Sequence, residues 1–310
     1  MQITKNTYAK FVILLALSNV AVEAFFFSNT PTPQSAPQNN TPPFTPKFPR
    51  CEVPGMAGTH PFEVCSIIKE IKKIGEDIKN GIPAPEDTRY DNVLVLEGPT
   101  GVGKTKLAAA IAKNANCHFY EIYGADVPNR FVGGSKDFIN KQIEIAIAEG
   151  KARKQPVIIF FDGIDVFSGN EQSTARTEYD AAYSAIRHYI DKNKDNSHVF
   201  FIFAIGDLES LPVQLKERFY SSIISIPKPD AEQRKALLHY FSKKHSKKDL
   251  AEYCSSDCIE QLIKKTENFS ARNIEDMCFD ANTYASDQDE PVDKNYLMYA
   301  LREMKAAVER

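Results

Sequence analysis

Residues 92–115 read NVLVLEGPTGVGKTKLAAAIAKNA, and this stretch decides the fold class of the chain. It opens with an apolar run of β-favouring residues, passes through a loop with three glycines, and ends in an Ala-rich segment that favours a helix. The order strand, loop, helix is typical of a parallel sheet covered by helices. We therefore expect an α/β fold.

The loop itself fits the pattern G-x-x-x-x-G-K-[ST] between a strand and a helix, which is typical of phosphate binding. Its glycines let backbone N–H groups curl around phosphate oxygens, and the next helix directs its positive end at the same anion. We expect Lys104 to reach the β- and γ-phosphates of ATP and Thr105 to bind Mg²⁺. The residues assigned to the nucleotide here are Gly98, Pro99, Thr100, Gly101, Val102, Gly103, Lys104, Thr105 and Lys106.

A second part of the site is predicted in IIFFDGID, residues 158–165. The apolar run that ends at Asp162 is typical of a central parallel strand buried on both faces. Because ligands bind at the carboxyl ends of such strands, Asp162 should lie beside the phosphate loop and hold the metal, through a bound water.

Strand and helix patterns alternate along the rest of the first part of the chain. This alternation predicts a doubly wound, mostly parallel sheet with helices on both faces. After Pro229 only helical patterns follow, which predicts a small all-helical lid. Strands are expected at residues 118–122, 157–162, 199–205 and 222–226, and helices at 136–149, 177–192, 231–245, 257–265, 271–285 and 292–308.

The order of several motifs resembles the AAA+ ATPase family over residues 61–310. The similar stretches are YGADVPNRFVGGSKDFINKQIEIAIAEGKARKQPVIIFFDGID, VFFIFAIGDLESLPVQLKERF, IPKPDAEQRKALLHYF and FSARNIEDMC. The resemblance implies an AAA+ P-loop nucleotide-binding domain at residues 61–228 and a helical lid domain at 229–310.

The resemblance also implies roles for residues outside the loop. Arg218 matches the arginine finger that reaches the γ-phosphate of a neighbouring subunit, and Arg272 matches the second sensor of some branches. Phe131, Val132 and Gly133 match the pore loop that contacts a translocated polypeptide, although Phe131 also fits a core aromatic. The implied partners are copies of the chain or related AAA+ subunits in a ring, with a polypeptide substrate or adaptor.

Two departures from the family bear on catalysis. Gly163 stands where a glutamate usually activates water, and Asp207 (or Gly206, one residue earlier) stands where the first sensor is usually Asn. Loss of a general base costs about 10² to 10⁴ in rate, so slow hydrolysis is one expectation. Asp207 would orient the water instead, with Mg²⁺ offsetting the repulsion, or the site has drifted. The residues assigned to catalysis are Lys104, Asp162, Asp207 and Arg218.

Three function classes follow. The first is a ring-forming ATPase that remodels or translocates proteins, and the second is a non-hydrolysing ATP-binding subunit of an AAA+ assembly. A different P-loop enzyme, such as a small-molecule kinase, is disfavoured by the helical C-terminal part and the finger motif. The net charge of −3 and the scattered Lys and Arg do not suggest an electrostatic nucleic-acid binder, so no nucleic-acid partner is expected.

The N-terminus suggests a destination. Lys5 and Lys10 precede an apolar run, and a small-x-small pattern ends at Ala24, which predicts a signal peptide at residues 1–24 and export or an endomembrane lumen. Residues 11–27 are alternatively a membrane anchor, giving membrane contact, and an organelle presequence is a third option. Residues 25–60 are expected to be a disordered linker, because 28–50 hold seven of the 18 Pro.

Six cysteines stand at positions 51, 65, 117, 254, 258 and 278. Cys117 is expected to be a buried thiol, while Cys254–Cys258 and Cys51–Cys65 are plausible disulfides that the sequence does not assign. No Cys or His cluster has zinc spacing, so we expect no zinc site.

Overall fold

The fold was described from a computed structural model. It describes residues 50–53, 59–82, 92–127, 134–165, 173–194, 196, 198–219 and 223–308. All of them fall in one compact unit, residues 48–310.

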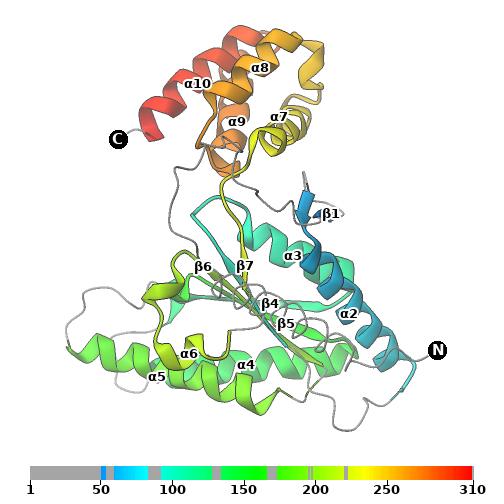
Figure 1. Ribbon diagram of the computed structural model, residues 1–310, viewed down its shortest axis with the longest axis vertical. Helices are drawn as coiled ribbons and strands as arrows, with labels where there is room; N and C mark the ends of the chain where they lie inside the picture. The colour runs from blue at the N-terminus through cyan, green and yellow to red at the C-terminus, as the bar shows by residue number, and fades with distance from the viewer. Residues whose placement is uncertain are drawn as a thin grey trace, which may run out of the picture. The chain divides into compact units, whose positions relative to one another are not determined.

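A five-stranded parallel sheet forms the centre of the fold (Figure 1). In sheet order its strands are β4 (His118–Tyr123), β5 (Val157–Asp162), β6 (Val199–Ile205), β3 (Val93–Glu97) and β7 (Ile223–Ser225). In the register, Asp162 pairs with Ala204 and Glu97 pairs with Ile205. The carboxyl ends of β5, β6 and β3 therefore meet at one edge of the sheet.

Helices cover both faces of this sheet, as predicted. Helices α4 (Gly134–Arg153) and α5 (Ser173–Lys192) share one apolar core with the sheet, and α2 (Phe62–Lys79) and α3 (Lys104–Ala115) share the other. Successive residues of β6 alternate between the two cores, and all seven are buried. Burial on both faces explains why β5 and β6 are continuous apolar runs. The doubly wound fold prediction is confirmed.

A short hairpin precedes α2. Strands β1 (Arg50–Glu52) and β2 (Thr59–Pro61) pair in antiparallel fashion, and Val53 is buried in the core beneath α2 and α3. Except for Pro61, these strands fall inside residues 25–60, which were expected to be a Pro-rich linker, and neither the strands nor α2 were predicted. The domain boundaries themselves stay a prediction.

The C-terminal part is helical and has a core of its own. Its helices are α7 (Ala231–Ser246), α8 (Ser256–Lys265), α9 (Ala271–Asp287) and α10 (Lys294–Val308). Side chains of all four meet in one buried cluster that includes Leu238, Leu262, Met277 and Leu301. The Arg234 side chain donates hydrogen bonds to the carbonyls of Ile263 and Pro229, so it ties the start of α7 to the end of α8. The prediction of a helical lid is consistent with this arrangement.

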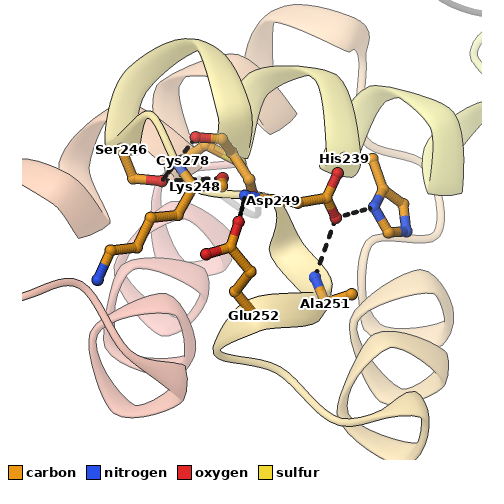
Figure 2. Close-up of polar contacts among 8 residues, drawn as sticks. His239, Ser246, Lys248, Asp249, Ala251, Glu252 and Cys278 are labelled. Atoms are coloured by element: carbon orange, nitrogen blue, oxygen red, sulfur yellow. Dashed lines mark hydrogen bonds and ion pairs between the residues drawn. The ribbon is translucent and has the colours of Figure 1, made fainter.

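The turn between α7 and α8 is closed by polar contacts (Figure 2). Asp249 Oδ1 accepts hydrogen bonds from the Ala251 amide at 3.1 Å and pairs with His239 Nδ1 at 2.9 Å. Glu252 Oε1 accepts from the Asp249 amide at 2.8 Å. The Ala251 amide, followed by His239, lowers the pKa of Asp249. We interpret this cluster as a structural cap on the short 3₁₀ turn Leu250–Glu252.

The structure bears on the expectations about disulfides and free cysteines. Cys254 and Cys258 form a disulfide, and Cys65 is also disulfide-bonded. Cys117 and Cys278 are free thiols, and burial raises the pKa of each to about 12. Within the described part of the chain, no group of His, Cys, Asp or Glu has the arrangement of a metal site, and no helix has both the length and the apolarity to cross a membrane.

Candidate functional site

The phosphate loop lies between β3 and α3, as its motif predicts. Lys104 Nζ donates hydrogen bonds to the carbonyl oxygens of Gly98 at 2.6 Å and Pro99 at 3.0 Å, so its ammonium lies over the loop. Burial lowers the pKa of Lys104, and the carboxylates of Asp162 and Asp165 oppose that shift. The lysine is therefore held where loop and acidic groups converge.

The start of α3 is open to an anion. Gly103 is its N-cap residue and has φ +100°, and no side chain caps the helix there. A side-chain atom added at Gly103 would meet nothing within 4 Å. The first N–H groups of a helix have no partner within the helix, so an uncapped start with free space beside it fits a phosphate group.

Thr105 and Asp162 meet at the metal position. Thr105 lies in the first turn of α3 and its Oγ1 donates to Asp162 Oδ2, at the end of β5, over 2.8 Å. A hydroxyl and a carboxylate beside a phosphate pocket are the oxygen ligands that Mg²⁺ takes in such sites. The residues present therefore fit ATP with Mg²⁺.

The two departures from the family pattern, at Gly163 and at Asp207, lie at the same edge of the sheet. Gly163 follows Asp162 with φ +69°, and its amide donates to the Ala204 carbonyl at 3.1 Å. A Cβ at Gly124 would lie 2.3 Å from the Gly163 carbonyl oxygen, so two backbones touch at this turn. A Cβ at Gly163 itself would meet nothing within 4 Å, so its positive φ is what favours glycine there, and no carboxylate directly follows Asp162.

Asp207 already has a structural task. Its carboxylate accepts a hydrogen bond from the Glu209 amide at 3.0 Å and caps the 3₁₀ turn Leu208–Ser210. Asp165 Oδ2 accepts from the amides of Gly206 at 2.7 Å and Asp207 at 3.4 Å, so it orients this loop. Our reading of the motif missed Asp165. The signal was present, because this second acid follows Asp162 by three residues.

Two of the residues assigned to the nucleotide, Arg272 and Lys106, take part in contacts between the phosphate-loop region and the lid. The Arg272 amide, at the start of α9, donates to the Gly101 carbonyl in the phosphate loop at 3.0 Å. Lys106 does not turn toward the loop, because its Nζ pairs with Glu275 of α9 at 2.6 Å. Of the remaining loop residues, Pro99 and Thr100 are exposed and Val102 is partly buried.

Arg218 lies beside α5. Its guanidinium pairs with both carboxylate oxygens of Asp191, at 3.2 and 3.0 Å, and with Glu217 at 3.2 Å. The hydrogen bond to Asp191 raises the pKa of Arg218, burial opposes this rise, and the charges of Asp191 and Glu217 add to it, so that the net pKa is raised. The predicted pore loop Phe131, Val132 and Gly133 lies outside the described residues.

Comparisons with known proteins identify the domain around this site. The profile of the family described as "ATPase family associated with various cellular activities (AAA)" matches residues 94–226. Cell division protein C of Sulfolobus acidocaldarius is 33% identical over 188 residues, which cover 59% of this chain and 48% of that protein. Proteasome-activating nucleotidase of Saccharolobus solfataricus is 26% identical over 228 residues, covering 71% and 55%.

A solved structure shows the same fold. The FIGL-1 AAA domain in complex with ADP superposes with a TM-score of 0.59 at 18% identity, covering 81% of this chain and 83% of that one. The chain spans about half the length of the curated relatives it matches. ATP and Mg²⁺ are the cofactors of this family, in agreement with the geometry of the loop and Asp162.

The localisation prediction is wrong. Export or residence in an endomembrane lumen rested on short patterns, the apolar run after Lys10 and the small residues before Ala24. The relatives are instead named for cell division and for proteasome activation, and they outweigh such patterns. Residues 1–24 and 11–27, on which the signal-peptide and membrane-anchor predictions fall, lie outside the described residues.

Site geometry and sequence relatives agree on one family. The phosphate loop, the Thr105–Asp162 contact and the parallel sheet lie within or beside the matched residues 94–226. A helical lid follows them in the order that the motifs predicted. The family profile over residues 94–226, the similar curated proteins and the fold together support an AAA+ ATPase.

Proposed function

We propose that the chain binds ATP with Mg²⁺ and hydrolyses it, as one subunit of a ring that remodels or translocates a polypeptide. The observation that carries the proposal is the 2.8 Å contact of Thr105 with Asp162 beside the uncapped start of α3. Relatives named for proteasome activation and cell division support a role in acting on other macromolecules.

Each residue of the pocket has a distinct task in this proposal. ATP supplies the anhydride bond that is cleaved, and Mg²⁺ neutralises the charge that develops on its phosphates. Lys104 brings a positive charge to the phosphates, Thr105 and Asp162 hold the metal, and the α3 amides bind an anion.

Hydrolysis is proposed to be slow, because no side chain at position 163 activates water. Asp165 and Asp207 are the acids on the neighbouring ends of β5 and β6. Both carboxylates accept backbone hydrogen bonds, Asp207 from the Glu209 amide and Asp165 from the amides of Gly206 and Asp207. Asp165 also contributes charge at Lys104. We assign the larger part in turnover to Asp165.

The proposed ring is based on the contacts of Arg218. Its contacts are with Asp191 and Glu217, beside α5 and α6 (Val213–Lys216), and not with the phosphate loop among the described residues. An arginine finger that does not contact the nucleotide of its own subunit acts on the nucleotide of a neighbouring subunit. The second candidate, a non-hydrolysing subunit, is favoured by the backbone constraint at Gly163 and is separated by the experiments below.

Restoring the family glutamate should not restore activity. Gly163→Glu places an L-residue at φ +69°, which costs about 1–2 kcal/mol of stability, so we expect a lower Tm and no gain in turnover. Gly163→Asn is the matched control, because Asn tolerates this conformation better. A Glu variant as stable as the wild type, with faster hydrolysis, would contradict this account of the turn.

Asp165 should matter more than Asp207 for turnover. We expect Asp165→Asn to lower the ATPase rate about 10-fold or more, because removing one catalytic acid–base group or its alignment has at least this effect. Asp207→Asn keeps a capping side chain and should lower the rate less. Steady-state phosphate release measures both, and the reverse order would show that Asp207 orients the water.

Mixing inactive subunits tests the ring. Arg218→Ala should lower the ATPase rate about 10³-fold or more, and Lys104→Ala should also be inactive. A mixture of the two should regain activity, because the Lys104 variant still supplies an arginine to the intact pocket of the other. Arg153→Ala, at an exposed position of α4, is the control and should behave as wild type. Full activity of Arg218→Ala alone, or no recovery in the mixture, would contradict a finger acting between subunits.

A further inference from the structure

The lid touches the phosphate loop directly through the start of α9. Ser270 caps this helix, with its Oγ accepting from the Asn273 amide at 3.2 Å. The Arg272 amide instead donates to the Gly101 carbonyl at 3.0 Å. The first N–H groups of a helix have no acceptor within it, so the phosphate loop supplies the acceptor that α9 lacks.

The fit at this point is tight. A Cβ added at Gly101, whose φ is +81°, would lie 2.7 Å from Ser270 Oγ and 3.0 Å from Arg272 Cβ. The loop and the helix start therefore approach as closely as a glycine permits. A small displacement of the loop therefore requires the start of the helix to move as well, and the reverse is also true.

One turn further along α9, Glu275 makes a second connection. Its Oε2 accepts from Lys106 Nζ of α3 at 2.6 Å, and its Oε1 accepts from Lys244 Nζ of α7 at 2.6 Å. Arg272 and Glu275 are three residues apart and so share a face of the helix. Lys106 lies in the first turn of α3, directly after Thr105. The two connections thus run side by side between α3, with its loop, and the lid.

The lysines are held by an aromatic ring as well. Lys106 Nζ lies 5.4 Å and Lys244 Nζ 5.7 Å from the centre of the buried Phe241 ring, within the range of cation–π attraction. Burial raises the pKa of Glu275, but the two lysines more than offset this, and the net pKa is lowered. Glu275 is therefore an anion between two cations at neutral pH.

We infer that Glu275 and Lys106 are positioning residues, which hold α9 on the phosphate loop so that Arg272 is aligned toward the bound nucleotide. The inference rests on the proposed function for the part played by Arg272. It assigns Lys106 to the lid contact, in place of the direct nucleotide contact expected from the motif. Lys244 connects α7 to α9 within the lid and has no part in the link to the loop.

Amide hydrogen exchange at Arg272, in the nucleotide-free protein, tests the link without any need for hydrolysis. Its N–H is protected by the Gly101 carbonyl, so exchange reports how often α9 leaves the loop. Glu275→Gln and Lys106→Met should each speed exchange at Arg272 about two- to five-fold, as expected for loss of one partly exposed ion pair. The double variant should match Lys106→Met, because Glu275→Gln removes no link between lid and loop that Lys106→Met leaves in place.

Lys244→Met is the matched control. It removes the other cation from Glu275 but leaves the bridge from Lys106, so exchange at Arg272 should stay within two-fold of wild type, about the smallest effect expected for the bridge itself. Unchanged exchange in Glu275→Gln, or additive effects in the double variant, would overturn the link.

Nucleotide binding then tests the alignment. Fluorescent ADP and a non-hydrolysable ATP analogue should show a lower preference for the ATP form in Glu275→Gln, by about the same two- to five-fold factor. An unchanged preference, despite faster exchange, would overturn the positioning role. If the wild type binds neither nucleotide, the proposed function fails, while the exchange result still decides the link.

Discussion

The hydrogen bond between Thr105 and Asp162 is the contact on which the site depends. It joins the first turn of α3 to the end of β5, although β6 lies between β5 and the strand that leads into α3. This contact is possible only because the parallel register brings the ends of three strands to one edge. That register in turn depends on strands buried on both faces, which leave no alternative partner for their apolar side chains.

Most elements of the fold are predictable because their residues allow one solution. β6 is apolar throughout and β5 is apolar up to its last residue, Asp162, and such strands are typical of a sheet covered by helices on both faces. The interpretation overlooked α2, although Val64, Ile71 and Ile74 recur at helical spacing and are buried. The hairpin β1–β2 was hidden because its neighbours are rich in Pro, so composition pointed to a linker.

The residues of the site also separate into those that the sequence predicts and those that it does not. Lys104, Thr105 and Asp162 are predictable because a motif sets their spacing, and the structure brings them together. Partners from distant segments are not predictable, as for Arg218 with Asp191 or Lys106 with Glu275, because they depend on how helices meet. The backbone at Gly163 is also a tertiary property, since a close approach of Gly124 accompanies it. When a motif lacks an expected side chain, the backbone conformation at that position should therefore be known before loss of function is inferred.

Calorimetric titration of the wild-type chain with ADP and a non-hydrolysable ATP analogue, with and without Mg²⁺, tests the central claim most directly. The account predicts binding that Mg²⁺ strengthens, and it predicts that Asp162→Asn and Thr105→Ala each lose that Mg²⁺ dependence while remaining folded. No binding by the wild type, or the same response to Mg²⁺ in both variants, would contradict it.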